Sequence, residues 1–190
     1  MTGKNVVMFG PPGAGKGTQA AKLKDFLGVP HISTGDMFRY HIKNNTDLGK
    51  TAKSYSDQGK LVPDEVTIAM VKDRLSQPDV KAGFLLDGFP RSTPQAEALD
   101  KMLASIGKKL DAVVNIAVAD SEVKARLAKR ATIEGRKDDA DPKVIENRLN
   151  TYKSQSEPCL KYYGPKGIVK NIDGMGTIDE IFGRIKALFV

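Results

Sequence analysis

A glycine-rich stretch near the start of the chain constrains the fold more than any other feature. Residues 10–18 read Gly-Pro-Pro-Gly-Ala-Gly-Lys-Gly-Thr and follow an apolar run, Val-Val-Met-Phe, at residues 6–9. The glycines let the backbone curl until successive N–H groups point inward, and the lysine can reach β- and γ-phosphate oxygens. We therefore expect a buried strand, a loop that binds a polyphosphate, and a helix whose positive end faces the anion.

The loop departs from the usual pattern at one position. Gly17 stands between Lys16 and Thr18, so the hydroxyl that usually binds Mg²⁺ is displaced by one residue. A turn of glycine and proline between strand and helix would explain the glycines, but it would not explain a lysine at this spacing. We therefore prefer the phosphate-binding interpretation.

Apolar runs alternate with amphipathic segments along the rest of the chain. Further strands are expected at residues 29–33, 84–87, 112–118 and 168–172. Helices are expected at residues 15–27, after Ser33, and at 49–59, 63–75, 94–106, 121–131, 142–163 and 178–189. This alternation predicts an α/β fold, with a five-stranded parallel sheet covered by helices on both faces. Ligands bind such sheets at the carboxyl ends of the strands, where residues 10–18, Thr34 and Asp87 emerge.

The composition fits one globular domain spanning residues 1–190, with 40% hydrophobic and 28% charged residues. There is no apolar stretch of the ~20 residues that a membrane span needs and no signal-peptide pattern, so we expect a cytoplasmic protein without a membrane partner. The single cysteine, Cys159, agrees with a reducing compartment. The net charge of +7 would suit nucleic acid, but the basic residues are scattered, and a substrate with several phosphates would need the same surplus.

Several spaced motifs complete the pattern. Ser-Thr-Gly-Asp-Met-Phe-Arg occupies residues 33–39, Gly-Lys-Leu-Val-Pro-Asp-Glu residues 59–65, and Asp-Gly-Phe-Pro-Arg-Ser-Thr-Pro-Gln residues 87–95. Together with the loop at 10–18, and in this order, these motifs resemble adenylate kinase. The resemblance implies a P-loop nucleoside monophosphate kinase of nucleotide biosynthesis that converts ATP and AMP into two ADP with Mg²⁺. It also implies a core at 1–32, 63–130 and 142–190, an AMP-binding segment at 33–62 and a lid at 131–141.

The resemblance assigns roles residue by residue. The ATP-binding positions are Gly13, Ala14, Gly15, Lys16, Gly17, Thr18, Arg126, Arg130 and Gly176. The AMP-binding positions are Thr34, Arg39, Lys60, Leu61, Val62, Gly88, Phe89, Pro90, Arg91, Gln95, Arg136 and Arg148. The catalytic positions are Lys16, Arg91, Arg126, Arg130, Arg136 and Arg148. Asp87 would hold Mg²⁺ through water.

Each role has a chemical reason and a simpler alternative. A Gln95 amide offers a donor and an acceptor to a base edge, and a guanidinium fork such as that of Arg91 matches two phosphate oxygens. Thr34 or Ser33 could also cap the following helix, and Asp87 could cap the turn after it. Arg126 and Arg130 lie on one helix face, and without the resemblance they would indicate only a basic surface.

The lid is expected to be short. Only residues 131–135 separate Arg130 from Arg136, which is too little for a zinc-binding or β-sheet lid, so no structural zinc is expected. Asp138 and Asp139 match acids of the family's lid. We also expect a monomer.

Other functions make different demands on the sequence. A nucleotide-operated switch shares the loop and the fold, but the chain has no Asn-Lys-x-Asp guanine-reading motif and such a switch has no use for a second nucleotide site. The related uridylate and cytidylate kinases carry Ala-Gly-Glu and Arg-Asn-x-Asp-Asn where this chain has residues 34–36 and 91–95. A kinase for another nucleoside monophosphate remains the alternative within the same reaction class.

Overall fold

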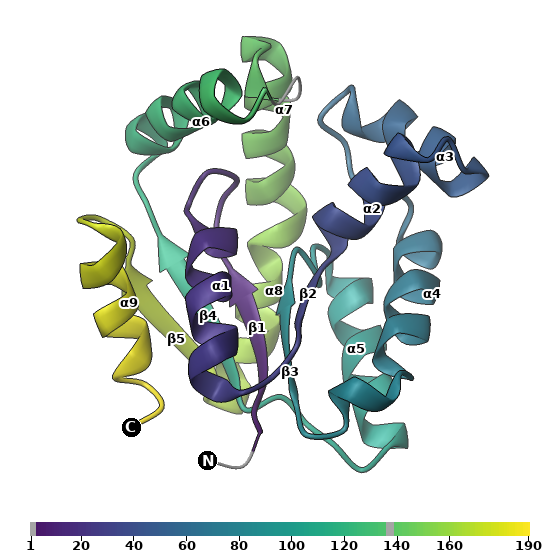
Figure 1. Cartoon of the computed structure of the whole chain (residues 1–190), viewed down its shortest axis with the longest axis vertical. Coiled ribbons are helices and arrows are strands. Elements are labelled where there is room, and N and C mark those ends of the chain that lie inside the picture. Colours follow the sequence, from purple (N-terminus) through teal and green to yellow (C-terminus); the bar gives the residue numbers. More distant parts are fainter. Residues whose placement is uncertain (1–2, 136–138) are drawn as a thin grey trace.

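The computed structural model describes residues 3–135 and 139–190, and a five-stranded parallel sheet forms its centre (Figure 1). The strands are β1 (Asn5–Phe9), β2 (His31–Ser33), β3 (Phe84–Asp87), β4 (Ala112–Ala117) and β5 (Val169–Asp173). Their order is β2-β3-β1-β4-β5, and every pairing is parallel. The predicted fold class is therefore confirmed.

The helices follow the strands in the predicted alternation. Before β4 they are α1 (Lys16–Leu27), α2 (Thr34–Lys43), α3 (Asp47–Ser56), α4 (Asp64–Leu75) and α5 (Thr93–Ser105). After β4 they are α6 (Asp120–Glu134), α7 (Pro142–Thr151), α8 (Pro158–Tyr163) and α9 (Ile178–Lys186). The long helix expected at 142–163 is divided, because the segment Tyr152–Ser156 between α7 and α8 widens into a π-helical turn.

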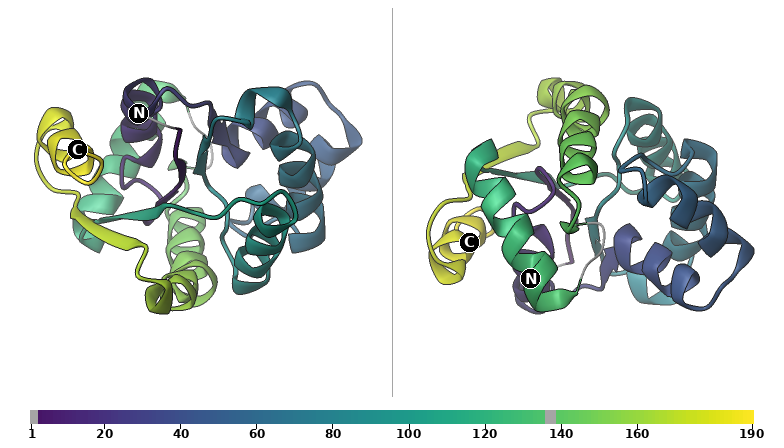
Figure 2. Two further views of the ribbon diagram at one scale, coloured as in Figure 1. Left: turned by 90° about the horizontal axis from the view of Figure 1, so that it is seen from below. Right: turned by 90° about the horizontal axis from the view of Figure 1, so that it is seen from above.

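The alternating side chains of β1 separate two cores. Val6 and Met8 face one layer, where they pack with side chains from α1 and α9. Val7 and Phe9 face the other layer, which α4, α5 and α8 cover. Figure 2 shows α1 and α8 on opposite sides of the sheet. Such burial on both faces explains why the strands read as continuous apolar runs.

The register of the central strands aligns the residues that lead into the site. Asp87, the last residue of β3, pairs with Met8 on one side and with Ser33 on the other. The loop after β1, the start of α2 and the residues after Asp87 therefore leave the sheet at the same edge. This is the edge at which parallel sheets bind ligands.

Two groups of helices stand beyond this edge (Figure 1). On one side α2 and α3 pack together, and on the other α6 packs on α7 through Val123, Leu127 and Leu149. Helix α6 continues past Ala131, where the apolar pattern ends, and stops at Gly135, whose φ of 62° is left-handed. The predicted end at Ala131 was therefore too early, because the glycine and not the loss of apolar residues ends this helix. In the described chain, the helices are too short or too polar to cross a membrane.

Removal of a buried side chain far from this edge tests the core. Leu99 of α5 is fully buried, so Leu99→Ala should lower the free energy of unfolding by about 2 to 5 kcal/mol through lost burial and a residual cavity. Leu188→Ala is the control, since that side chain is 36% exposed. Urea unfolding of both variants checks the prediction, and equal losses would contradict it.

Candidate active site

The loop at residues 10–18 wraps around the start of α1. Gly15 precedes the helix with a φ of 89° and offers no side chain as a cap, which leaves the first N–H groups of α1 available to an anion. Gly13 also has a positive φ, of 82°, and a Cβ at this position would lie 2.9 Å from Leu127 Cγ of α6. Glycine is therefore required at residue 13 both for the turn and for close packing against α6.

Lys16 points back into this loop. Its Nζ donates hydrogen bonds to the carbonyl oxygens of Gly10, at 2.8 Å, and Pro11, at 2.9 Å. Burial lowers the pKa of Lys16 to about 8; Asp87 opposes this shift, whereas Arg91, Arg148 and Arg130 reinforce it. The Lys16 ammonium is therefore close enough to these four predicted site residues for their charges to shift its pKa.

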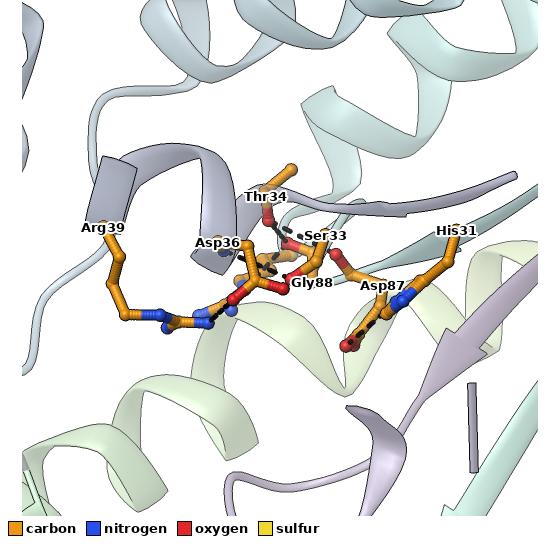
Figure 3. Close-up of polar contacts among 8 residues, drawn as sticks. His31, Ser33, Thr34, Asp36, Arg39, Asp87 and Gly88 are labelled. Atoms are coloured by element: carbon orange, nitrogen blue, oxygen red, sulfur yellow. Dashed lines mark hydrogen bonds and ion pairs between the residues drawn. The ribbon is translucent and has the colours of Figure 1, made fainter. Parts of the chain in front are cut away.

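Asp87 lies across from Lys16 at the end of β3, and its side chain is 13% exposed. Burial alone would raise the pKa of Asp87, but His31, Lys16 and Arg91 outweigh it and hold the pKa below its usual value. His31 Nε2 lies 3.8 Å from Asp87 Oδ2, and the two side chains point toward one another from neighbouring strands (Figure 3). A Cβ on Gly17 would lie 3.8 Å from Asp87 Oδ2, so the carboxylate faces the phosphate loop.

The donor set at Asp87 suits one kind of metal ion. Among the described residues, no group of three or more His, Cys, Asp or Glu side chains could enclose a cation. One ionised carboxylate beside a phosphate loop fits Mg²⁺, which keeps most of its waters and is held by one or two carboxylates together with substrate phosphates. The prediction that Asp87 binds the metal through water therefore agrees with the donors that are present.

The start of α2 forms the second half of the site. Ser33 caps this helix by accepting from the Asp36 N–H at 3.2 Å, so the cap predicted at Ser33 or Thr34 is Ser33. Thr34 is buried and donates to the Gly88 carbonyl oxygen at 2.8 Å. Arg39 lies against Asp36 on the exposed face of α2 (Figure 3).

Gly88 and Arg91 connect this half to the sheet. Arg91 Nε donates to the Gly88 carbonyl oxygen at 2.8 Å, and burial lowers the pKa of Arg91. Gly88 has a φ of 81°, and a Cβ there would lie 2.6 Å from Thr34 Oγ1. Phe89 is fully buried in the core, so its side chain supports the loop and only its backbone can face a ligand.

Gln95 is held at both ends of its amide. Its Oε1 accepts from the Arg91 backbone N–H at 2.7 Å, and its Nε2 donates to Asp64 Oδ1 at 2.8 Å. Ser92 Oγ donates to the same oxygen of Asp64 at 2.9 Å. Asp64 lies near the start of the helix expected at 63–75, and its contact with Gln95 was not predicted.

A buried carboxylate gathers two of the predicted arginines. Asp139, whose side chain is 0% exposed, accepts from Arg130 Nε at 2.5 Å and from Arg130 Nη2 at 3.0 Å, and also from Arg148. Burial would raise the pKa of Asp139, but these arginines hold it below its usual value. The carboxylate thus sets two guanidinium groups side by side. The predicted residues Arg136 and Asp138 lie outside the described residues.

Arg126 points toward a different part of the edge. It donates to Glu122 Oε1 at 2.7 Å and to the Gly174 carbonyl oxygen at 2.9 Å, which ties α6 to the loop after β5. Arg184, which the sequence did not single out, holds the same loop through the carbonyl oxygens of Asp173, at 2.8 Å, and Met175, at 2.5 Å. Gly176 lies in this loop with a φ of 111°.

The structure thus brings together most of the predicted residues. The charges of Asp87, Arg91, Arg130 and Arg148 all act on the Lys16 ammonium, so these groups lie within electrostatic range of the phosphate loop. Lys60, Leu61 and Val62 form the connection between α3 and α4. A cluster of fixed cations around a phosphate loop is suited to stabilising the charge of a phosphoryl group in transfer.

Comparisons with known proteins agree with this geometry. The family model described as Adenylate kinase matches residues 8–168. The Adenylate kinase of Thermobifida fusca is 51% identical over 179 residues, which cover 94% of each chain. That of Micrococcus luteus is 52% identical over 180 residues, covering 95% of this chain and 87% of the relative. That of Streptomyces avermitilis is 48% identical along an alignment 206 positions long, which covers 94% of each chain.

The environment of Lys16 makes a testable prediction about its titration. In the free protein the Lys16 ammonium should titrate near pH 8 instead of 10.5, and inorganic triphosphate should raise this midpoint because an anion favours the charged form. Above about pH 8 triphosphate should therefore bind more weakly, since binding must then recover a proton. NMR of protein labelled with ¹³C-lysine measures the midpoint, and the Lys16→Arg variant identifies the resonance. A midpoint at 10.5 without ligand would contradict the prediction.

The burial of Asp139 predicts that removing its charge lowers the stability of the fold. Asp139→Asn keeps the shape but removes the negative charge that Arg130 and Arg148 share, so the free energy of unfolding should fall by about 1 to 3 kcal/mol at pH 7. This contribution is complete above the ordinary pKa of 3.8 and is lost as the pH falls through the lower folded value.

Urea unfolding measures the effect of Asp139→Asn. The control is Asp25→Asn, which removes an acid that is 79% exposed and should cost less than about 1 kcal/mol. Similar losses in both variants would show that Asp139 does not hold the arginines together.

Proposed function

The chain belongs to the adenylate kinase family, and on this premise we propose that it transfers the terminal phosphoryl group of ATP to AMP, giving two ADP. The observation that carries this proposal is the phosphate loop that holds Lys16, whose ammonium is within electrostatic range of Arg91, Arg130 and Arg148. A second group of polar side chains at Thr34 and Gln95 lies beside it, as a second nucleotide would require.

The reaction needs positioning and charge stabilisation more than it needs a general base. The attacking oxygen of the AMP phosphate is already anionic near neutral pH, so we assign no proton acceptor. Arg39 and Arg91 would hold that phosphate, and Lys16 would meet the β- and γ-phosphates of ATP. Arg130 and Arg148 would neutralise charge spread over the transferred group, aided by Arg136 and Arg126.

Asp87 would hold Mg²⁺ through water, and the bound metal would neutralise phosphate charge on ATP. Within the chain itself, Asp87 also balances the positive field around Lys16. The Asp87 carboxylate lies beside His31 and faces Gly17 of the phosphate loop, so it would be the protein group that holds the hydrated cation there. We propose no structural zinc.

The same proposal gives each segment of the chain a role. Residues 33–62 would bind AMP, residues 131–141 would act as a short lid, and the remaining residues would form the core. Closure of the lid would exclude water, the competing nucleophile. The alignment with the Streptomyces avermitilis relative is 206 positions long, more than the 190 residues of this chain, so that relative has residues without a counterpart here, which supports a shortened form. We further propose a cytoplasmic monomer.

Rival functions lack support at the second group of residues. A nucleotide-operated switch or a simple binding module would use the phosphate loop but not Arg91, which lies at the Gly88 turn between the two halves. A kinase for another nucleoside monophosphate would keep the phosphate contacts and change the groups near Gln95. The base of the acceptor therefore distinguishes the proposal from this second candidate.

An assay coupled to ADP formation tests the proposed function. With ATP as donor, AMP should be turned over with a much higher kcat/KM than GMP, CMP or UMP. Lys16→Ala should lower turnover by at least ~100-fold with the fold intact, because a charge that meets the phosphates during transfer is lost. The control is Lys22→Ala, on the same helix, whose side chain is 41% exposed and pairs with Asp179. No turnover of AMP, or near-normal activity of Lys16→Ala, would overturn the proposal.

A further inference from the structure

A carboxylate outside the predicted site fixes the orientation of the Gln95 amide. Gln95 is 1% exposed and carries one anchor on each side of its amide group. The Arg91 backbone N–H donates to Oε1 at 2.7 Å, and Nε2 donates to Asp64 Oδ1 at 2.8 Å. Because a carboxylate can only accept, the nitrogen must face Asp64 and the oxygen must face Arg91.

This fixed orientation leaves a defined pattern for a base. One Nε2 hydrogen and one lone pair of Oε1 remain after the two anchors are counted. The six-amino edge of adenine offers an acceptor at N1 and a donor at the amino group, which match one donor and one acceptor. The edge of a six-oxo purine reverses both roles and would need the amide turned over. An amide that cannot turn is therefore able to distinguish the two edges.

We propose that Asp64 is a positioning residue for base selection, which acts through Gln95 to favour six-amino over six-oxo purine monophosphates. This inference rests on the proposed function, in which Gln95 contacts the base of AMP. Among the described residues, the Asp64 side chain accepts hydrogen bonds from the Gln95 amide, at 2.8 Å, and from Ser92 Oγ, at 2.9 Å.

The contacts of Asp64 differ from those of an acid that only stabilises the start of a helix. Asp64 is the first residue of α4, where any acid favours the positive helix end. The neighbouring Glu65 is an exposed acid in the same first turn, whereas the Asp64 side chain accepts hydrogen bonds from Ser92 and Gln95 at the start of α5. A change at Glu65 therefore reproduces the loss of charge without the loss of the amide contact.

A double-mutant cycle tests the inference on the full chain. The quantity measured is the ratio of kcat/KM for AMP to kcat/KM for IMP, with ATP as donor, in the native protein, Asp64→Ala, Gln95→Ala and the double variant. Each ratio is taken on one protein sample, so a partly unfolded fraction cancels. Loss of one charge-assisted hydrogen bond should lower the ratio about tenfold in Asp64→Ala, mainly through a higher KM for AMP with kcat retained.

If Asp64 acts through Gln95, the double-mutant cycle gives a specific result. In the Gln95→Ala background, Asp64→Ala should lower the ratio no further. Asp64→Asn keeps an oxygen at the same place and should recover most of the ratio, and Glu65→Ala should leave it unchanged.

Each contrary outcome has its own meaning. A native ratio in Asp64→Ala, with a reduced ratio in Gln95→Ala, would overturn the positioning role and leave the proposed function intact. If Asp64→Ala lowers the ratio as much in the Gln95→Ala background as in the native protein, Asp64 acts independently of the amide and the inference is overturned. It is also overturned if Asp64→Asn and Glu65→Ala both lower the ratio as much as Asp64→Ala does. An unchanged ratio in Gln95→Ala would reject base reading by Gln95 itself, and with it the inference.

Discussion

Repulsion among cations is the constraint around which this site is built. Lys16, Arg91, Arg130 and Arg148 are held within electrostatic reach of one another, and burial with this mutual repulsion brings the pKa of Lys16 down to about 8. Two buried acids oppose that repulsion. Asp87 faces the phosphate loop, and Asp139 binds Arg130 and Arg148 together. The polyphosphate of a substrate would complete this balance of charge, which is why such a site binds anions strongly.

The backbone around the site serves the same purpose. The first turn of α1 and the glycines before it present N–H groups instead of side chains, and Lys16 meanwhile donates to the carbonyl oxygens of Gly10 and Pro11. A phosphate could accept hydrogen bonds from these N–H groups, and from Lys16 in place of the two carbonyl oxygens, at little structural cost. On the acceptor side, the Gly88 carbonyl oxygen receives bonds from Thr34 and Arg91, so one turn after β3 aligns side chains from two elements.

Many of the elements follow from local signals in the sequence. Continuous apolar runs predicted β3 and β4 to within a residue, and Gly28, at a φ of 67°, ends α1 where a left-handed cap was expected. The errors occur where a helix end or a break depends on something other than apolar spacing. Gly135 ends α6 beyond its apolar face, and the π-helical turn at Tyr152–Ser156 interrupts a helix whose pattern reads as continuous.

The sequence by itself determined the parallel sheet, the phosphate loop and the identity of most residues at the edge, because these depend on local spacing and on the chemistry of short motifs. Only the tertiary structure decided which side chains meet. Asp139 read as part of a charged loop, yet it is fully buried between two arginines. Asp64 belongs to a helix predicted at 63–75, yet its side chain accepts a hydrogen bond from Gln95 of another helix. Such pairings join residues that are distant in sequence, and the packing of helices on the sheet, which no local pattern encodes, brings them within hydrogen-bonding distance.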